Sequence, residues 1–157
     1  MIETMRKNLR LKEYDYSKTG VYYITVCCQN RLPLFEQEKA KQIVETWIHK
    51  LEEKYDPVVL DTYVIMPDHV HFILIKTETD DIPLSRMITW LKTMTTNAYI
   101  KEVLAHHLMP FEKRMWQRNY YEHVIRNEED LNEKREYIIN NPIKHRDKKY
   151  IPMYEDL

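Results

Sequence analysis

Glycine is almost absent from this sequence, which has a single one, Gly20, among its 157 residues. Phosphate-binding loops and dinucleotide-binding turns need several glycines, because their backbone must approach the phosphates closely. Neither motif occurs in the chain, so enzymes that bind nucleotide cofactors through such loops are excluded. Cysteine is scarce as well. Cys27 and Cys28 are neighbours whose side chains would point to opposite faces of a strand, which argues against a disulfide between them.

Long apolar runs and a secretory signal are also missing. Charged residues interrupt every longer apolar run before it reaches membrane-spanning length, and residues 1–16 lack the apolar core of a signal peptide. With two cysteines that cannot pair, these features predict a cytoplasmic protein with no membrane partner. The length predicts one domain spanning residues 1–157. The net charge of −1 does not itself indicate a nucleic-acid partner, although basic residues gather at 6–18 and 143–150.

The spacing of apolar residues predicts alternating strands and helices. Short β-branched and aromatic runs predict four strands, the last near a sheet edge: residues 20–29, 57–68, 69–76 and 121–126. Helical spacing predicts two amphipathic helices: residues 36–55 and 80–104. A last helix should begin after Asn127 as its N-cap and end at Pro142. The order β-α-β-β-α-β predicts an α+β fold of the ferredoxin-like kind, an antiparallel sheet with helices on one face plus a C-terminal helix.

Two histidines, His69 and His71, stand one residue apart at the start of the predicted strand "HVHFILIK". Residues i and i+2 of a strand point to the same face, about 7 Å apart, so the two imidazoles project together. Two imidazoles on one strand are able to bind a single divalent ion, each through one ring nitrogen. The alternative is a pair of polar residues on the exposed face of a strand, and the His-x-His pattern without a partner favours that alternative.

The last predicted helix carries a tyrosine and an asparagine at helical spacing. Tyr137 and Asn141 are four residues apart, so both lie on one helix face, about 6 Å apart along the axis. The amide oxygen of Asn141 is a hard ligand that suits Mg²⁺ or Mn²⁺, and the Tyr137 hydroxyl is a poor nucleophile unless a metal polarises its target. The alternatives are an aromatic that packs the helix down and a C-terminal cap before Pro142.

Taken together, these motifs resemble a known family. The segment "MPDHVHFIL" resembles the metal-binding signature of HUH single-strand endonucleases, and "YIINNP" resembles the catalytic helix of single-tyrosine transposases. Between them, "MWQRNYYEHVIRN" places a Trp-Gln-Arg segment before a His-Val-Ile-Arg strand, which is similar to the REP-associated branch of these transposases. The resemblance extends over residues 20–144, nearly the whole chain.

This resemblance implies an enzyme that nicks and rejoins single-stranded, hairpin-bearing DNA with the help of a divalent metal, Mg²⁺ or Mn²⁺. It implies that His69, His71 and Asn141 are the metal ligands. It also implies that Tyr137 is the nucleophile, which forms a 5′-phosphotyrosine intermediate and leaves a free 3′-OH. The expected function is therefore that of a tyrosine transposase.

Several alternatives stay open at this point. Tyr120 and Tyr121 are rival nucleophiles, although neither has Asn or Gln one helical turn later. Trp116 and Arg118 are candidates for stacking on an unpaired base or clamping a phosphate, with core packing as the alternative for Trp116. A non-catalytic nucleic-acid-binding module and a metal-dependent phosphodiesterase that uses water are the alternative functions. Whether the protein acts as a monomer or a homodimer is also open.

Overall fold

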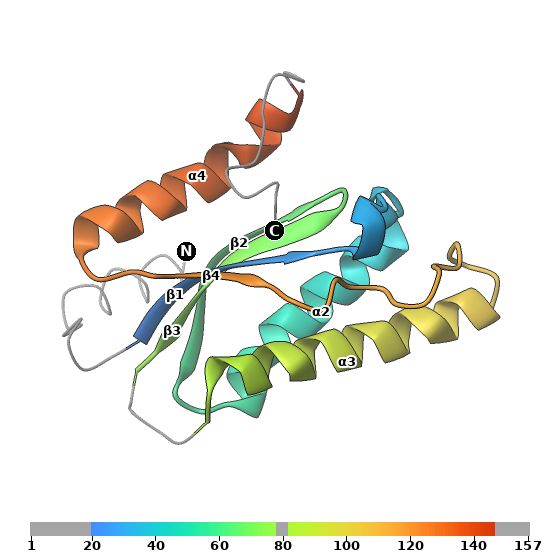
Figure 1. The fold of residues 1–157 in the computed structure, drawn as a ribbon, viewed down its shortest axis with the longest axis horizontal. Coiled ribbons are helices and arrows are strands. Elements are labelled where there is room, and N and C mark those ends of the chain that lie inside the picture. The colour runs from blue at the N-terminus through green and yellow to red at the C-terminus, as the bar shows by residue number, and fades with distance from the viewer. Residues whose placement is uncertain (1–19, 78–81, 147–157) are drawn as a thin grey trace.

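A computed structural model of the chain describes residues 20–77 and 82–146, with side chains up to Asn141. Four antiparallel strands form one sheet in the order β2-β3-β1-β4 (Figure 1). The strands are β1 (Gly20–Cys27), β2 (Val58–Met66), β3 (His69–Lys76) and β4 (Tyr121–Val124). The helices are η1 (Gln29–Arg31), η2 (Leu34–Glu36), α2 (Glu38–Lys54), α3 (Leu84–Leu104) and α4 (Glu128–Arg146). The basic clusters predicted near the two ends lie outside the residues whose side chains are described.

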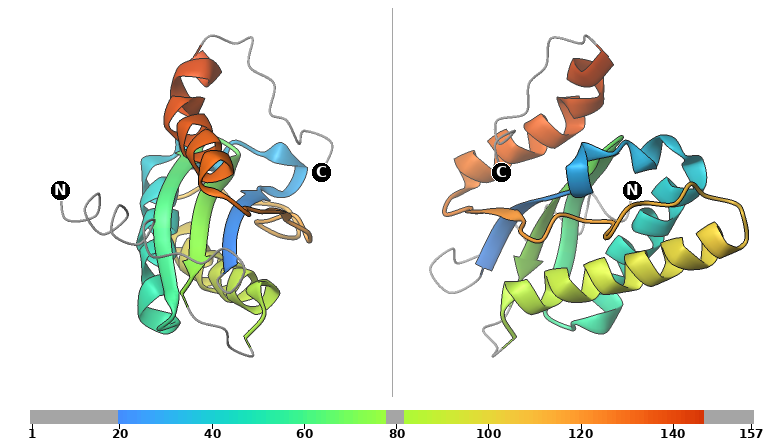
Figure 2. Two further views of the ribbon diagram at one scale, coloured as in Figure 1. Left: turned by 90° about the vertical axis from the view of Figure 1, so that its left-hand side faces the viewer. Right: turned by 45° about the vertical axis from the view of Figure 1, so that its right-hand side comes forward.

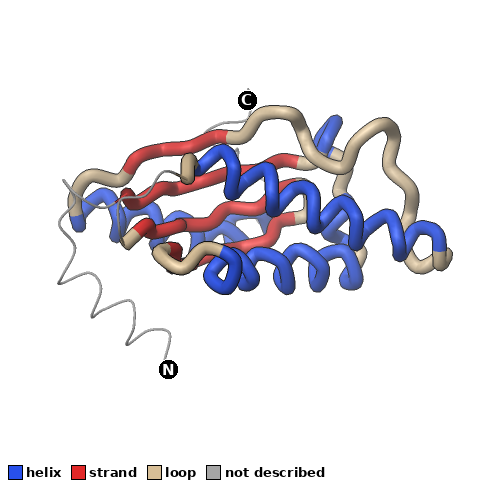
Figure 3. Tube along the Cα trace, turned by 90° about the horizontal axis from the view of Figure 1, so that it is seen from below, coloured by secondary structure: helices blue, strands red, loops and turns tan. Residues whose placement is uncertain are grey.

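Helices cover both faces of this sheet. Figure 3 shows α2 and α3 lying side by side across the strands, and α4 lies on the opposite face (Figure 2). The strand order and the two helices on one face are those of the predicted ferredoxin-like fold, and α4 is the additional C-terminal helix. Within the described ranges, no helix combines the length and the apolarity needed to cross a membrane.

Two separate apolar cores lie on the two faces, because side chains alternate along each strand. The larger core lies under α2 and α3 and includes Ile24, Val26, Val44, Ile48, Val70, Phe72, Met87 and Leu91. The smaller core lies under α4 and includes Val21, Tyr23, Val59, Ile73, Ile75, Leu131 and Ile138. Every residue of β3 is buried. A side chain on β3 is therefore held rigidly between neighbours, whichever face it points to.

The predictions for the two ends of α4 differ in their outcome. Asn127 is the predicted cap, since its Oδ1 accepts a hydrogen bond of 2.8 Å from the backbone N–H of Asp130. The prediction that Pro142 ends the helix is wrong, because α4 continues through it to Arg146. A proline removes one backbone donor and disfavours the helical conformation of the residue before it, but it does not forbid the helix to continue.

Trp116 belongs to the larger core. Its side chain is only 4% exposed, and its indole N–H donates to Thr95 Oγ1 at 2.9 Å. The ring packs against Phe35, with the centroids 5.4 Å apart. Of the two roles considered for Trp116, the structure therefore shows core packing. Almost none of its ring is exposed to stack on a base. Arg118, two residues later, is exposed.

Candidate active site

The histidine pair lies on the face of the sheet that α4 covers. His69 and His71 are 3% and 0% exposed, so the alternative of two polar residues on an exposed strand face is wrong. Their Nε2 atoms are 3.0 Å apart, and their ring centroids 4.5 Å. Two ring nitrogens at this separation are able to direct their lone pairs at one ion.

The other ring nitrogen of His71 contacts two hydroxyl groups of β1. Its Nδ1 lies 2.9 Å from Thr25 Oγ1 and 3.2 Å from the Tyr23 hydroxyl. When Nδ1 carries the proton and donates it to these oxygens, Nε2 keeps its lone pair. Burial, followed by the nearby charges of His69 and Arg31, holds the pKa of His71 well below its usual value. The ring is therefore neutral at pH 7, which is the form that binds a metal.

His69 is oriented by the residue before it. Its Nδ1 lies 2.6 Å from Asp68 Oδ1, while Asp68 Oδ2 accepts a hydrogen bond of 3.0 Å from Arg31 Nε. Burial raises the pKa of Asp68, but the hydrogen bonds from His69 and Arg31 outweigh burial and leave that pKa below its usual value. An anionic Asp68 accepts a hydrogen bond from the Nδ1–H of His69. The proton of the neutral ring is therefore on Nδ1, and the unprotonated Nε2 faces His71. Asp68 was not among the predicted site residues, although an acid directly before His-x-His is a usable signal.

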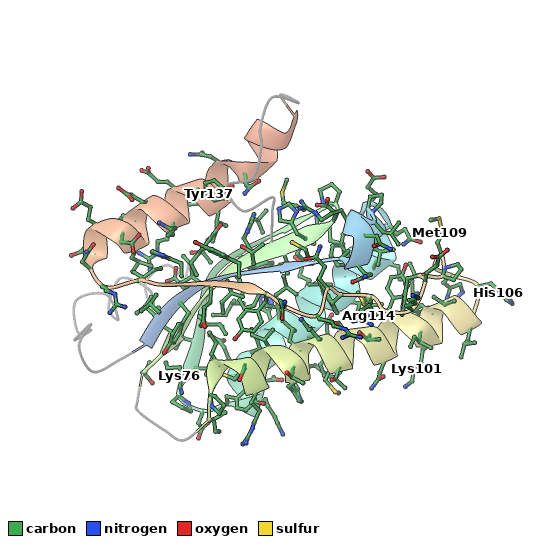
Figure 4. The ribbon with its side chains drawn as sticks, in the orientation of Figure 1. Lys76, Lys101, His106, Met109, Arg114 and Tyr137 are labelled. Carbon is green, nitrogen blue, oxygen red and sulfur yellow. The ribbon has the colours of Figure 1, made fainter. Side chains whose placement is uncertain are left out.

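Helix α4 brings the predicted tyrosine to this pair. The ring centroid of Tyr137 is 5.7 Å from that of His71 and 6.3 Å from that of Tyr23, and both contacts are edge-on. Figure 4 shows Tyr137 on the side of α4 that faces the sheet. Asn141 follows one helical turn later and is fully buried. The Tyr137 hydroxyl oxygen and the Asn141 amide oxygen are both buried atoms on that helix face.

The histidine pair needs a further protein ligand to hold a metal ion. Among the described residues, no three His, Cys, Asp or Glu side chains gather closely enough to form a metal site by themselves. A third protein ligand to the histidine pair would therefore be a different kind of donor. The buried amide oxygen of Asn141 is such a donor, and a hard oxygen ligand suits Mg²⁺ or Mn²⁺.

An ion pair between Asp61 and Arg135 holds α4 on the sheet. The Nε of Arg135 donates to Asp61 Oδ2 at 2.8 Å, and its Nη2 donates to Oδ1. Both side chains are withdrawn from solvent, with exposures of 0% for Asp61 and 14% for Arg135. Asp61 occupies a break in the β2–β3 register between Leu60 and Thr62. Val59 belongs to the smaller core and Leu60 to the larger one, so the alternation along β2 places the Asp61 carboxylate on the face that α4 covers.

A second polar cluster fixes the beginning of α4 to the opposite edge of the sheet. Asp130 Oδ2 lies 2.7 Å from His123 Nε2 of β4, and Asp130 Oδ1 accepts from Lys134 Nζ at 2.8 Å. His123 is thus half-buried and contacts α4. The helix is tied to both outer strands, so Tyr137 lies above the central strands that carry the site.

The two rival tyrosines point to different faces. Tyr120 lies on the α3 side, with its ring centroid 5.9 Å from Lys92 Nζ, so the sheet separates it from the histidines. Tyr121 lies on the α4 side, where its ring stands edge-on to Tyr23 at 6.4 Å. Tyr121 is therefore the relevant rival to Tyr137 and the natural control for it.

Comparisons with known proteins find relatives of this chain over most of its length. The family model described as "Transposase IS200 like" matches residues 17–141. An uncharacterized protein of Haemophilus influenzae is 32% identical over 159 residues, 88% of each chain. A REP-associated tyrosine transposase of Escherichia coli is 28% identical, over 83% of this chain and 70% of the relative. A solved REP-associated tyrosine transposase bound to a REP hairpin superposes with a TM-score of 0.64 and 27% identity, over 85% of this chain and 72% of that one.

The buried ion pair makes a testable prediction about stability. Replacing Arg135 by Met leaves the Asp61 carboxylate buried without its guanidinium, which should lower the free energy of unfolding by about 3 kcal/mol. Urea denaturation measures the loss. The double variant Asp61→Asn/Arg135→Met should lose clearly less than the sum of the two single losses, since it removes the uncompensated charge. Strictly additive losses would contradict the pairing, and Glu136→Gln, an exposed neighbour on α4, is the control.

Proposed function

The chain belongs to the IS200-like transposase family, and from this premise we propose that it is a metal-dependent tyrosine transposase that nicks and rejoins single-stranded DNA. The contact between Tyr137 and His71 is the observation that carries the proposal. It places a hydroxyl-bearing side chain beside two imidazoles whose Nε2 atoms converge. A module that only binds DNA has no need of a tyrosine at that position.

The proposed metal ligands are His69, His71 and Asn141. A divalent metal held there would act as a Lewis acid that polarises the scissile phosphate. Asp68 and Thr25 hold the two imidazoles by their Nδ1 atoms, so the Nε2 atoms stay directed at the same point. The protein thereby fixes the ligand geometry before DNA arrives.

Tyr137 performs the covalent step in this proposal. Its phenol loses a proton while its oxygen forms a bond to the phosphorus of the scissile phosphate, and the bond from phosphorus to the 3′ oxygen breaks. The 3′ oxygen takes up a proton and leaves as a 3′-OH, and the 5′ side of the strand stays attached as a 5′-phosphotyrosine. Attack by a 3′-OH on that ester reverses the step and rejoins a strand. One phosphodiester replaces another, so no ATP is consumed.

The proposed substrate is single-stranded DNA that carries a hairpin, and the hairpin bound to the structural relative supports this choice. We also propose that Tyr137 attacks in cis, at the histidine pair of its own chain. The support is that Tyr137 and His71 are in contact within one chain and that Arg135, two residues before Tyr137, pairs with Asp61 of the same chain. A monomer then contains a complete site.

The covalent intermediate is the first prediction of the proposed function. Incubation with labelled hairpin DNA from the flanks of its own gene, plus Mg²⁺ or Mn²⁺, should give a shifted band on a denaturing gel. Tyr137→Phe should reduce that band by at least about a thousandfold, because the attacking oxygen is gone. Tyr121→Phe, the control on the same face, should keep it. Cleavage without a shifted band would favour hydrolysis by water, and binding without either would favour a binding module.

Metal binding gives a second prediction that does not depend on activity. Calorimetric titration with Mn²⁺ should show one site in the DNA-free protein, lost in His71→Ala. Asp68→Asn should weaken Mn²⁺ binding by about 10- to 100-fold, because the carboxylate that orients His69 becomes a neutral amide. His49→Ala changes an exposed histidine of α2 and serves as the control. Unchanged Mn²⁺ affinity in both site variants would refute the assignment.

Mixing two inactive variants tests attack in cis. Tyr137→Phe retains the histidine pair, and His71→Ala retains the tyrosine. If each tyrosine serves its own chain, an equimolar mixture should form no more adduct than the two variants alone. Adduct that appears on mixing would show that α4 crosses to a second chain, as in a homodimer with exchanged helices.

A further inference from the structure

A groove lies between α3 and the segment 111–118 that leads to β4. It encloses about 480 Å³ and is lined from both sides. Its lining from α3 is polar, with threonines at several positions, and its lining from the segment is basic and aromatic. The residues that matter here are Thr93, Thr96, Phe111, Lys113, Arg114 and Arg118. We refer to it as the α3 groove.

The charge of the α3 groove is opposite to that of DNA. Four cationic side chains line it, Lys92, Lys113, Arg114 and Arg118, and no carboxylate occurs among its described lining residues. This concentration stands out in a chain whose net charge is −1. Clustered Lys and Arg side chains along a groove attract the phosphates of a nucleic acid strand.

Lys92 fixes the shape of the groove. Its Nζ donates to the backbone carbonyl oxygens of Gln117, Arg118 and Asn119, at 2.8, 3.0 and 3.3 Å. These bonds tie the segment to α3, so both walls keep their separation. The charge of Lys92 is directed to the backbone, which leaves Lys113, Arg114 and Arg118 as the cations that serve a ligand.

Apolar groups accompany these cations. Phe111 is half-buried in the lining, and Ile100 of α3 is 41% exposed there. Bases of a single strand stack on or pack against such surfaces, whereas the bases of a duplex are already stacked on each other. The combination of cations with an aromatic ring therefore favours unpaired nucleotides over a duplex.

The α3 groove lies on the α3 side of the sheet and reaches the sheet edge at Gln117, whereas the histidine pair lies on the α4 side. The backbone N–H of Gln117 donates to the carbonyl of Cys27 at 2.9 Å, and Cys27 is the register partner of His69. Adjacent extended strands lie about 4.8 Å apart, so the backbones of Gln117 and His69 are about 10 Å apart across β1. Because the groove and the histidines lie on opposite faces, a DNA strand that joins them passes round the sheet edge at Gln117, and with one phosphate per ~3.4 Å this path takes more than about three nucleotides.

We propose that the α3 groove binds the unpaired nucleotides beside the scissile phosphate, with Lys113, Arg114 and Arg118 on their phosphates. The proposal rests on the proposed function for the identity of the DNA. An adjoining hollow of about 420 Å³ shares Lys92 and Arg118 with the groove but is also lined by Glu122. That carboxylate repels phosphate, so the phosphate-binding part is confined to the α3 groove.

Fluorescence anisotropy with a labelled single-stranded oligonucleotide tests the proposal. All proteins carry Tyr137→Phe and the buffer contains EDTA, so binding is measured without cleavage. The test variant is Lys113→Asn/Arg114→Gln/Arg118→Gln, with Asn because position 113 has a φ of 60°, which Asn tolerates. We expect at least about tenfold weaker binding, and a slope of log K against log salt that is smaller by about two, since each phosphate contact contributes about 0.7.

Two matched variants distinguish binding in the groove from a general effect of the protein's net charge on DNA affinity. Lys101→Gln removes one exposed cation of α3 that Figure 4 shows on the side away from Arg114, and it should bind as the parent does. Arg114→Lys/Arg118→Lys keeps the charges and should retain most of the affinity. Circular dichroism and thermal unfolding verify that each variant is folded.

Three outcomes would overturn the proposal. The triple variant could bind as tightly as Lys101→Gln, the charge-preserving variant could lose as much affinity as the triple variant, or the triple variant could lose equal affinity for a blunt duplex of the same sequence. None of these readouts depends on the adduct. A parent protein that forms no adduct would refute the proposed function, while the anisotropy result would still decide whether the groove binds a single strand.

Discussion

The ion pair between Arg135 and Asp61 is the interaction on which the site depends. Tyr137 and Asn141 face the sheet only while α4 stays docked, and the apolar contribution to docking is small, because the smaller core includes only Leu131 and Ile138 among the α4 residues whose side chains are described. A bidentate pair restrains both the position and the rotation of the helix, which an apolar contact does not. The buried carboxylate of Asp61 is therefore as much a part of the site as the histidines.

The two faces of the sheet have different roles, stability on one and the candidate site on the other. The larger core under α2 and α3 supplies most of the buried apolar surface, while the face under α4 accommodates polar groups such as Thr25 and the histidine pair. The histidines belong to β3, which has neighbours on both sides and is buried throughout. Their Nδ1 atoms donate hydrogen bonds to Thr25 of β1 and to Asp68, so the site is built on a fully buried central strand.

Local patterns predicted the fold and selected His69, His71 and Tyr137, which the structure brings into contact, because alternation along a strand and four-residue spacing along a helix are short-range properties. The burial of His69 and His71 was not predictable in this way, since it depends on α4, which comes much later in the chain. The partners Asp61 and Arg135 are 74 positions apart, and no local pattern reports on such a pair. Trp116 was ambiguous for the same reason, since only the tertiary structure places its indole beside Thr95.

The two polar anchors of α4 differ in their access to solvent, so dissolved salt affects them unequally. The Asp61–Arg135 pair is nearly dry, whereas Asp130 and His123 have side-chain exposures of 21% and 35%. Dissolved ions screen the exposed cluster far more than the buried pair. Added salt should therefore weaken the contact of α4 with β4 before it weakens the contact with β2. Tyr137 is only two residues from Arg135, so the nucleophile proposed here is next to the anchor that salt affects less.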